Sequence, residues 1–167
     1  MKTLIVHAHI VSPDLEIQDG ALLLENDRIA AVIQSGDALP AADQVIDAGN
    51  RMVMPGFFDI HCHGADRNDV CDNSVEAIRH IAKRKLQEGV TTWLPTTLTQ
   101  PQDKLEEIAA KCAAYMANPE FCRTPGLHVE GPFISGEDGP RGAHPREHVR
   151  HCSWTEFEEW QAAAGGR

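Results

Sequence analysis

The sequence predicts an α/β protein in which an N-terminal β-sandwich segment precedes a partial (β/α)8 barrel (TIM barrel) of about three βα units. Residues 1–50 hold short apolar runs separated by turn residues and show no helical period, which favours a small β-sandwich or β-meander. From residue 51 strand-like and helix-like segments alternate, which is typical of a parallel sheet. We therefore expect two domains: residues 1–50, the N-terminal part of a small β-sandwich domain, and residues 51–167, the first part of a barrel.

The apolar runs of the N-terminal segment are separated by residues that favour turns. Ser12-Pro13-Asp14 interrupts the first run, and Asn26-Asp27 supplies a two-residue turn between the next two. We expect strands over residues 4–11, 21–25, 28–34 and 44–47.

A helical spacing of apolar residues first appears over residues 74–88. Its members are Val75, Ile78, Ile81, Ala82 and Leu86. Asn73, with Glu76 three positions later, is the predicted N-cap in a capping box, and Gly89 is predicted to end the helix.

Further strands and helices surround this helix. Strands are expected over residues 52–60, 90–98 and 126–130, and a last helix over residues 154–164. A second helix begins at Pro101, ends at Asn118-Pro119 and has the apolar face Leu105, Ile108, Ala109, Cys112 and Met116. The βα repeat is about 35 residues long, so a barrel of eight units needs about 280 residues. We therefore expect a truncated barrel that stops where a fourth strand would begin.

Charge and composition restrict the class of partner. The chain has 15 basic and 25 acidic residues and a net charge of −10. Nucleic acids and anionic membranes bind clustered Lys and Arg, so we expect neither as a partner, whereas a small anionic substrate is compatible. The five cysteines form no C-x-x-C pair, and His7 and His9 interrupt the apolar start of the chain. We therefore expect no signal peptide and a cytoplasmic protein with reduced thiols.

His61-Cys62-His63 is the first candidate site. Side chains two residues apart on a strand point to one side, so both imidazoles can face one point at the strand's end. Carboxyl ends of barrel strands carry the active site, and two neutral imidazoles suit a divalent transition metal. We interpret His61 and His63 as metal ligands. His7-Ala8-His9 has the same spacing without an acidic partner motif, and we interpret it as two strand residues on one sheet face.

The stretch of residues 126–132 supplies a third ligand. Glu130 lies at the end of its strand, level with the histidine pair, and Gly131-Pro132 turns the chain away after it. His128 shares the face of Glu130 but lies one layer deeper, so we interpret it as a packed histidine behind the ligands. Asp59 shares the inward face of His61 and is expected to orient a histidine.

A loop rich in Gly and Pro follows over residues 133–148. A long loop directly after a catalytic strand is either a substrate-binding loop or a surface connection. Within it Arg141 and His144 can meet anionic or hydroxyl groups.

Four stretches together resemble the amidohydrolase superfamily and, within it, the N-acetylglucosamine-6-phosphate deacetylases. They are Met54-Pro55-Gly56-Phe57-Phe58-Asp59-Ile60-His61-Cys62-His63-Gly64, Gly89-Val90-Thr91-Thr92 with Pro95-Thr96-Thr97, Leu127-His128-Val129-Glu130-Gly131-Pro132-Phe133-Ile134, and Gly142-Ala143-His144-Pro145. The first is common to many amidohydrolases, whereas the third and fourth are more specific to the deacetylases.

The resemblance implies a split β-sandwich beside a (β/α)8 barrel in a homodimeric enzyme. It implies that Glu130 binds an essential divalent ion (Zn, Fe, Mn or Co), that His61 and His63 bind a second ion found in some members, and that Ala143 and His144 contact an amino-sugar phosphate. Two further metal-binding histidines and the catalytic aspartate are expected beyond residue 167, so the chain is expected to carry no catalytic residue and to be an inactive fragment on its own.

The reaction implied is the hydrolysis of N-acetylglucosamine 6-phosphate to glucosamine 6-phosphate and acetate, a step of amino-sugar catabolism. In this hypothesis the metal activates water and polarises the acetyl carbonyl, and an aspartate transfers a proton to the leaving amine. Two alternatives remain open. One is another amidohydrolase, of the dihydroorotase or hydantoinase type, and the other is a non-catalytic metal-binding or interaction fragment.

Overall fold

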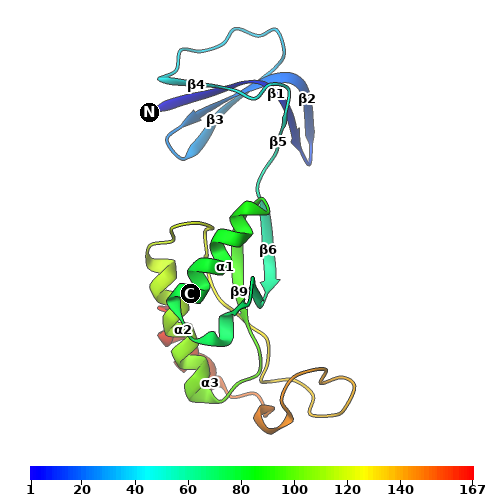
Figure 1. The fold of residues 1–167 in the computed structure, drawn as a ribbon, viewed down its shortest axis with the longest axis vertical. Helices are drawn as coiled ribbons and strands as arrows, with labels where there is room; N and C mark the ends of the chain where they lie inside the picture. The colour runs from blue at the N-terminus through cyan, green and yellow to red at the C-terminus, as the bar shows by residue number, and fades with distance from the viewer. The chain divides into compact units, whose positions relative to one another are not determined.

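The computed structural model describes residues 1–167 as two compact units, Met1–Pro55 and Gly56–Arg167 (Figure 1). The predicted boundary after residue 50 lies within the last residues of the first unit. The identification of the two units as parts of a sandwich and of a barrel stays a prediction.

The first unit is one mixed sheet of five strands. The strands are β1 (Lys2–Ser12), β2 (Leu15–Glu25), β3 (Arg28–Ile33), β4 (Gln44–Asp47) and β5 (Met52–Val53). The order is β3-β2-β1-β4, and β5 also pairs with β1. The β1–β2 and β2–β3 pairs are antiparallel, whereas β4 and β5 run parallel to β1. The second strand begins earlier than residue 21, because Pro13-Asp14 forms a tight turn that lets pairing start at Leu15.

The histidine pair near the N-terminus lies at an irregular part of β1. His7 has a left-handed backbone with φ of 50°, and the β1–β2 register shifts at this point. The Nδ1 atom of His7 lies 3.1 Å from Asp47 Oδ1, while His9 Nε2 lies 2.8 Å from Glu16 Oε1. Each imidazole therefore has its own carboxylate partner, and the two do not converge on one point.

The second unit is built on a parallel sheet of three strands. The strands are β6 (Phe57–Cys62), β9 (Val90–Thr97) and β10 (His128–Val129), in the order β10-β9-β6. The helices are α1 (Val75–Gln87), α2 (Gln102–Ala117) and α3 (Trp154–Ala163). The short elements are the hairpin of β7 (Gly64–Ala65) and β8 (Asn68–Asp69) and the 3-10 turns η1 (Val70–Asp72) and η2 (Arg146–His148). The α/β class expected for this part of the chain is confirmed.

Three local predictions are wrong. The strand expected over residues 52–60 is split at residues 54–56 into β5, which pairs with β1 in the first unit, and β6, which pairs with β9. The third strand pairs only at His128–Val129 and not over residues 126–130. The N-cap of α1 is Ser74, whose hydroxyl accepts a hydrogen bond from the Ala77 amide, and not Asn73. Asn73 instead ends η1 in a left-handed conformation with φ of 56°. Because η1 directly precedes α1, Asn73 serves as the C-cap of η1, and the N-cap of α1 is the next residue, Ser74.

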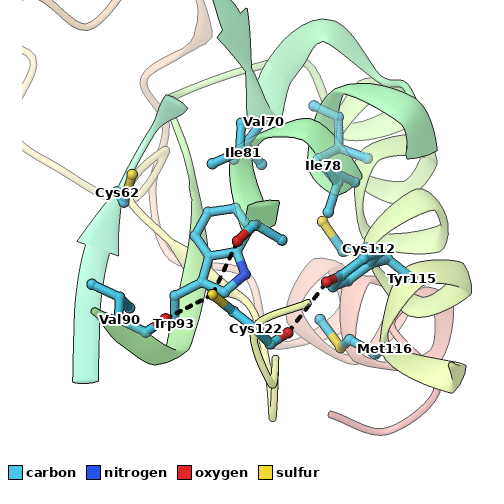
Figure 2. Close-up of a cluster of buried hydrophobic side chains, with 12 residues drawn as sticks. Cys62, Val70, Ile78, Ile81, Val90, Trp93, Cys112, Tyr115, Met116 and Cys122 are labelled. Carbon is cyan, nitrogen blue, oxygen red and sulfur yellow. Dashed lines mark hydrogen bonds between the residues drawn. The ribbon is translucent and has the colours of Figure 1, made fainter. Parts of the chain in front are cut away.

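The core of the second unit lies between the sheet and the first two helices (Figure 2). Trp93 of β9, Ile78 and Ile81 of α1 and Cys112 of α2 are all fully buried. The Cys122 thiol donates to the Val90 carbonyl at 2.9 Å and the Ala82 carbonyl at 3.0 Å, so it ties α1 to β9. Burial raises the pKa of this thiol to about 11, which keeps it a protonated donor.

The apolar face expected for α2 is confirmed, whereas that of α1 is confirmed in part, because Leu86 is 43% exposed and Val75 is only half-buried. Leu105, Ile108, Ala109, Cys112 and Met116 of α2 are buried, as are Ile78, Ile81 and Ala82 of α1. Gly89 follows α1 with φ of 86°, a conformation that favours glycine. No helix combines the length and apolar character required to cross a membrane.

Ile81→Ala is expected to lower the free energy of unfolding by about 2–5 kcal/mol, because it opens a cavity in a closed core. Leu86→Ala on the same helix is the matched control, since that side chain is 43% exposed and should cost less than about 1 kcal/mol. Urea unfolding followed by circular dichroism measures both. Equal losses in the two variants would contradict the core described for α1.

Candidate metal centre

The imidazoles of His61 and His63 lie at the carboxyl end of β6. There the backbone amides form hydrogen bonds with side chains, and the regular pairing with β9 is interrupted. The register between β6 and β9 is irregular between Asp59 and Cys62. The His61 amide donates to Asp59 Oδ1 at 3.1 Å, and the Cys62 amide donates to the buried Thr96 hydroxyl at 2.9 Å. These two bonds set the direction in which the strand presents His61 and His63.

Glu130 reaches the same point from the end of β10. Its Oε2 atom lies 3.0 Å from His61 Nε2 and 2.9 Å from His63 Nε2, and the two Nε2 atoms are 3.1 Å apart. The three side chains each offer one ligand atom, and these atoms lie within 4.8 Å of one another. The parallel order of the strands brings together residues that are 69 positions apart in the chain.

The backbone of β9 selects the tautomer of His63. Its Nδ1 atom lies 3.1 Å from the Thr96 carbonyl oxygen, which can only accept, so Nδ1 carries the proton. The lone pair of Nε2 then faces Glu130 and His61. A histidine fixed in this way through its other ring nitrogen is typical of metal ligands.

The donor set fits a divalent transition metal. Two ligand atoms that each lie about 2.1 Å from one ion are about 3.0 Å apart at a right angle and about 3.4 Å apart at the tetrahedral angle. The separations among His61, His63 and Glu130 are 2.9–3.1 Å. Two imidazoles and one carboxylate are also the ligand types that zinc and iron accept.

Electrostatics keep Glu130 ionised. Partial burial acts to raise the pKa of its carboxyl group, but the hydrogen bond with His61 and the electrostatic influence of the surrounding histidines outweigh burial and lower the pKa below its usual range. A carboxylate that stays charged next to imidazole lone pairs supplies negative charge for a cation.

His144 approaches the same carboxylate from the loop after β10, and its side chain is only 11% exposed. The Thr99 amide donates to His144 Nδ1 at 3.3 Å, so this nitrogen accepts and Nε2 carries the proton in the neutral ring. Nε2 lies 3.5 Å from Glu130 Oε1. The sequence assigned His144 to the substrate loop and did not place it beside Glu130; Ala143, its neighbour, is exposed.

The two residues expected behind the ligands are both close to the histidine pair. His128 lies with its ring edge-on to His61 at 4.9 Å and with Nδ1 3.3 Å from the Thr96 hydroxyl. Burial, and to a lesser extent the nearby His61, lower the pKa of His128. Asp59 contacts the backbone amide of His61 and the ammonium of Lys85, and not an imidazole ring.

A model described as the amidohydrolase family matches residues 52–166, which hold all of these side chains. The chain belongs to the amidohydrolase family. Enzymes of this family depend on metal ions, and His61, His63 and Glu130 form a group whose ligand atoms lie close enough together to hold one.

Several relatives are named N-acetylglucosamine-6-phosphate deacetylase, and one, from Escherichia coli O157:H7, is named N-acetylgalactosamine-6-phosphate deacetylase. N-acetylglucosamine-6-phosphate deacetylase of Bacillus subtilis is 29% identical over 94% of the chain, and the human protein of the same name is 33% identical over 74%. The solved structure of an N-acetyl-D-glucosamine-6-phosphate deacetylase mutant of Mycobacterium smegmatis, in complex with N-acetyl-D-glucosamine-6-phosphate, superposes on 99% of the chain with a TM-score of 0.83 and 23% identity. The chain spans 40%, 31% and 41% of the lengths of these three proteins.

Gly131→Ala is expected to disrupt the end of β10. Gly131 has φ of 76°, and a Cβ atom there would lie 2.0 Å from Thr99 Oγ1, the hydroxyl that contacts His144. We expect a loss of more than about 2 kcal/mol in the free energy of unfolding. Gly136→Ala in the same loop is the control, because its Cβ would meet only Val149 Cγ1 at 3.8 Å. A Gly131 variant as stable as the Gly136 variant would be inconsistent with this close approach.

Proposed function

We propose that these residues form part of the metal centre of an N-acetylglucosamine-6-phosphate deacetylase. The reaction is hydrolysis of the N-acetyl group of N-acetylglucosamine 6-phosphate to give glucosamine 6-phosphate and acetate. The convergence of His61, His63 and Glu130 in a chain of the amidohydrolase family carries the proposal. The names of its relatives in Bacillus subtilis and human support the substrate.

The proposed architecture is the first part of a (β/α)8 barrel of about three βα units, preceded by part of a β-sandwich. The parallel order β10-β9-β6 and the helices after β6 and β9 support the barrel. The five-stranded sheet of Met1–Pro55 supports the sandwich. We also propose a homodimeric, cytoplasmic enzyme for the whole protein.

A bound Zn, Fe, Mn or Co ion would activate water and polarise the acetyl carbonyl. His61, His63 and Glu130 would hold one or two such ions through their converging ligand atoms. The Thr96 carbonyl oxygen accepts a hydrogen bond from the Nδ1–H group of His63, which leaves the Nε2 lone pair of that ring available. We propose that His144, with a proton on Nε2, and Ala143 contact the sugar phosphate. Transfer of a proton to the leaving amine is assigned to an aspartate outside residues 1–167.

Metal binding is tested directly on the 167-residue protein. We expect Co²⁺ to bind with a visible ligand-field spectrum, and we expect His61→Ala and Glu130→Ala to lose it because each removes one of three ligands. His80→Ala is the matched control, since His80 is an exposed histidine of α1 outside the triad. Equal Co²⁺ binding by all four proteins would show that the triad is not the site.

Activity is tested on the complete reading frame that encodes these residues. We expect acetate release from N-acetylglucosamine 6-phosphate in the presence of zinc, iron or manganese. Glu130→Gln should lower kcat/KM by at least about 10³-fold, since it removes charge stabilisation worth several kcal/mol. Unphosphorylated N-acetylglucosamine and the C4 epimer N-acetylgalactosamine 6-phosphate serve as comparison substrates. No acetate with any of the three metals would reject the deacetylase, and we expect none from residues 1–167 alone.

A further inference from the structure

Lys85 carries a charge that none of the roles above uses. It lies on α1, and its side chain is only 15% exposed. Its Nζ atom lies 3.2 Å from Asp59 Oδ2 and 3.2 Å from Glu88 Oε2. Burial acts to lower the pKa of the ammonium, but the hydrogen bonds to the two carboxylates outweigh burial and raise the pKa, so Lys85 stays charged.

Asp59 connects this charge to the strand end that bears the ligands. One carboxylate oxygen pairs with Lys85, while the other accepts the hydrogen bond from the backbone amide of His61 at 3.1 Å. Because the β6–β9 register is irregular between Asp59 and Cys62, this bond is one of the interactions that fix the backbone there.

We propose that Lys85 and Asp59 are positioning residues of the metal centre, which act by fixing the backbone of His61. The inference rests on the proposed metal site. Rotation of the Asp59 carboxylate would release the His61 amide and change the direction of its imidazole. Lys85 restricts that rotation by binding the opposite oxygen. Metal ligands must be held to within about 0.5 Å to keep a productive geometry.

A second ion pair of α1 gives the contrast. Arg79 binds Glu120 through two guanidinium nitrogens, so this pair has a favourable geometry of its own. Both side chains are about half exposed, at 43% and 51%, and neither forms a hydrogen bond or ion pair with β6 or the triad. Loss of the Arg79–Glu120 ion pair should therefore change only the free energy of unfolding, whereas loss of the Lys85–Asp59 ion pair should also weaken metal binding.

The experiment compares Co²⁺ affinity and the Co²⁺ ligand-field spectrum in four variants of the protein. Lys85→Met keeps the length of the stem and removes the charge, and it should raise Kd for Co²⁺ by about 10–100-fold and change the spectrum. Lys85→Arg restores a cation and should return both readouts toward the parent protein. Asp59→Asn keeps an acceptor for the His61 amide but weakens the bond to Lys85, so we expect a smaller change in the same direction. Arg79→Met is the control and should leave both readouts unchanged.

The free energy of unfolding of each metal-free variant is measured as well, so that a loss of stability can be distinguished from a loss of ligand positioning. If Lys85→Met does not fold, the Asp59→Asn and Lys85→Arg pair still decides the question. A Lys85→Met or Asp59→Asn protein with the Kd and spectrum of the parent would overturn the inference, as would an Arg79→Met protein with the same change as Lys85→Met. A parent protein that binds no Co²⁺ at the triad would overturn the proposed metal centre. That result is distinct from a failure of the positioning role, in which the parent binds Co²⁺ and the variants bind it equally well.

Discussion

The parallel pairing of β6 and β10 on opposite sides of β9 is the constraint on which the rest of the site depends. Parallel strands end at one edge of a sheet, so His61, His63 and Glu130 meet without any direct pairing of their own strands. Thr96 of β9 lies between them and is fully buried. Its hydroxyl oxygen accepts a hydrogen bond from the Cys62 amide, and its carbonyl oxygen accepts one from the Nδ1–H group of His63. A single residue of the central strand therefore determines both the path of β6 and the tautomer of one ligand.

The rigidity of β9 comes from the core behind it. Trp93 is fully buried between the sheet and the helices, and the Cys122 thiol bonds to carbonyls of α1 and β9 rather than remaining available for chemistry. Close packing of this kind resists displacement, because any shift of β9 would open voids around Ile78 and Ile81. The polar groups at the carboxyl end of the strand can therefore act from fixed positions. The core thus contributes to the site indirectly, by limiting the conformations of Thr96.

Periodic features of the sequence predicted most of the fold. Apolar spacing located α1 and α2, and the end of an apolar strand located His61 and His63. Features without a period were missed. The approach of His144 to Glu130 depends on the path of a loop, and the Lys85–Asp59 pair depends on which face of α1 meets β6. Asn73 and Ser74 are both good cap residues, and only the short turn before them decides which one caps α1.

The two His-x-His motifs of this chain show why spacing alone does not make a site. His7 and His9 lie on a strand as His61 and His63 do, but a left-handed backbone at His7 breaks the alternation, and Asp47 and Glu16 each satisfy one ring. At the end of β6 no separate partner satisfies the two Nε2 atoms; both face the same carboxylate oxygen of Glu130. That shared oxygen comes from a strand that is not adjacent to β6, so only the topology of the sheet can supply it. A third ligand from a distant strand, rather than the local motif, is therefore what turns a pair of histidines into a candidate metal centre.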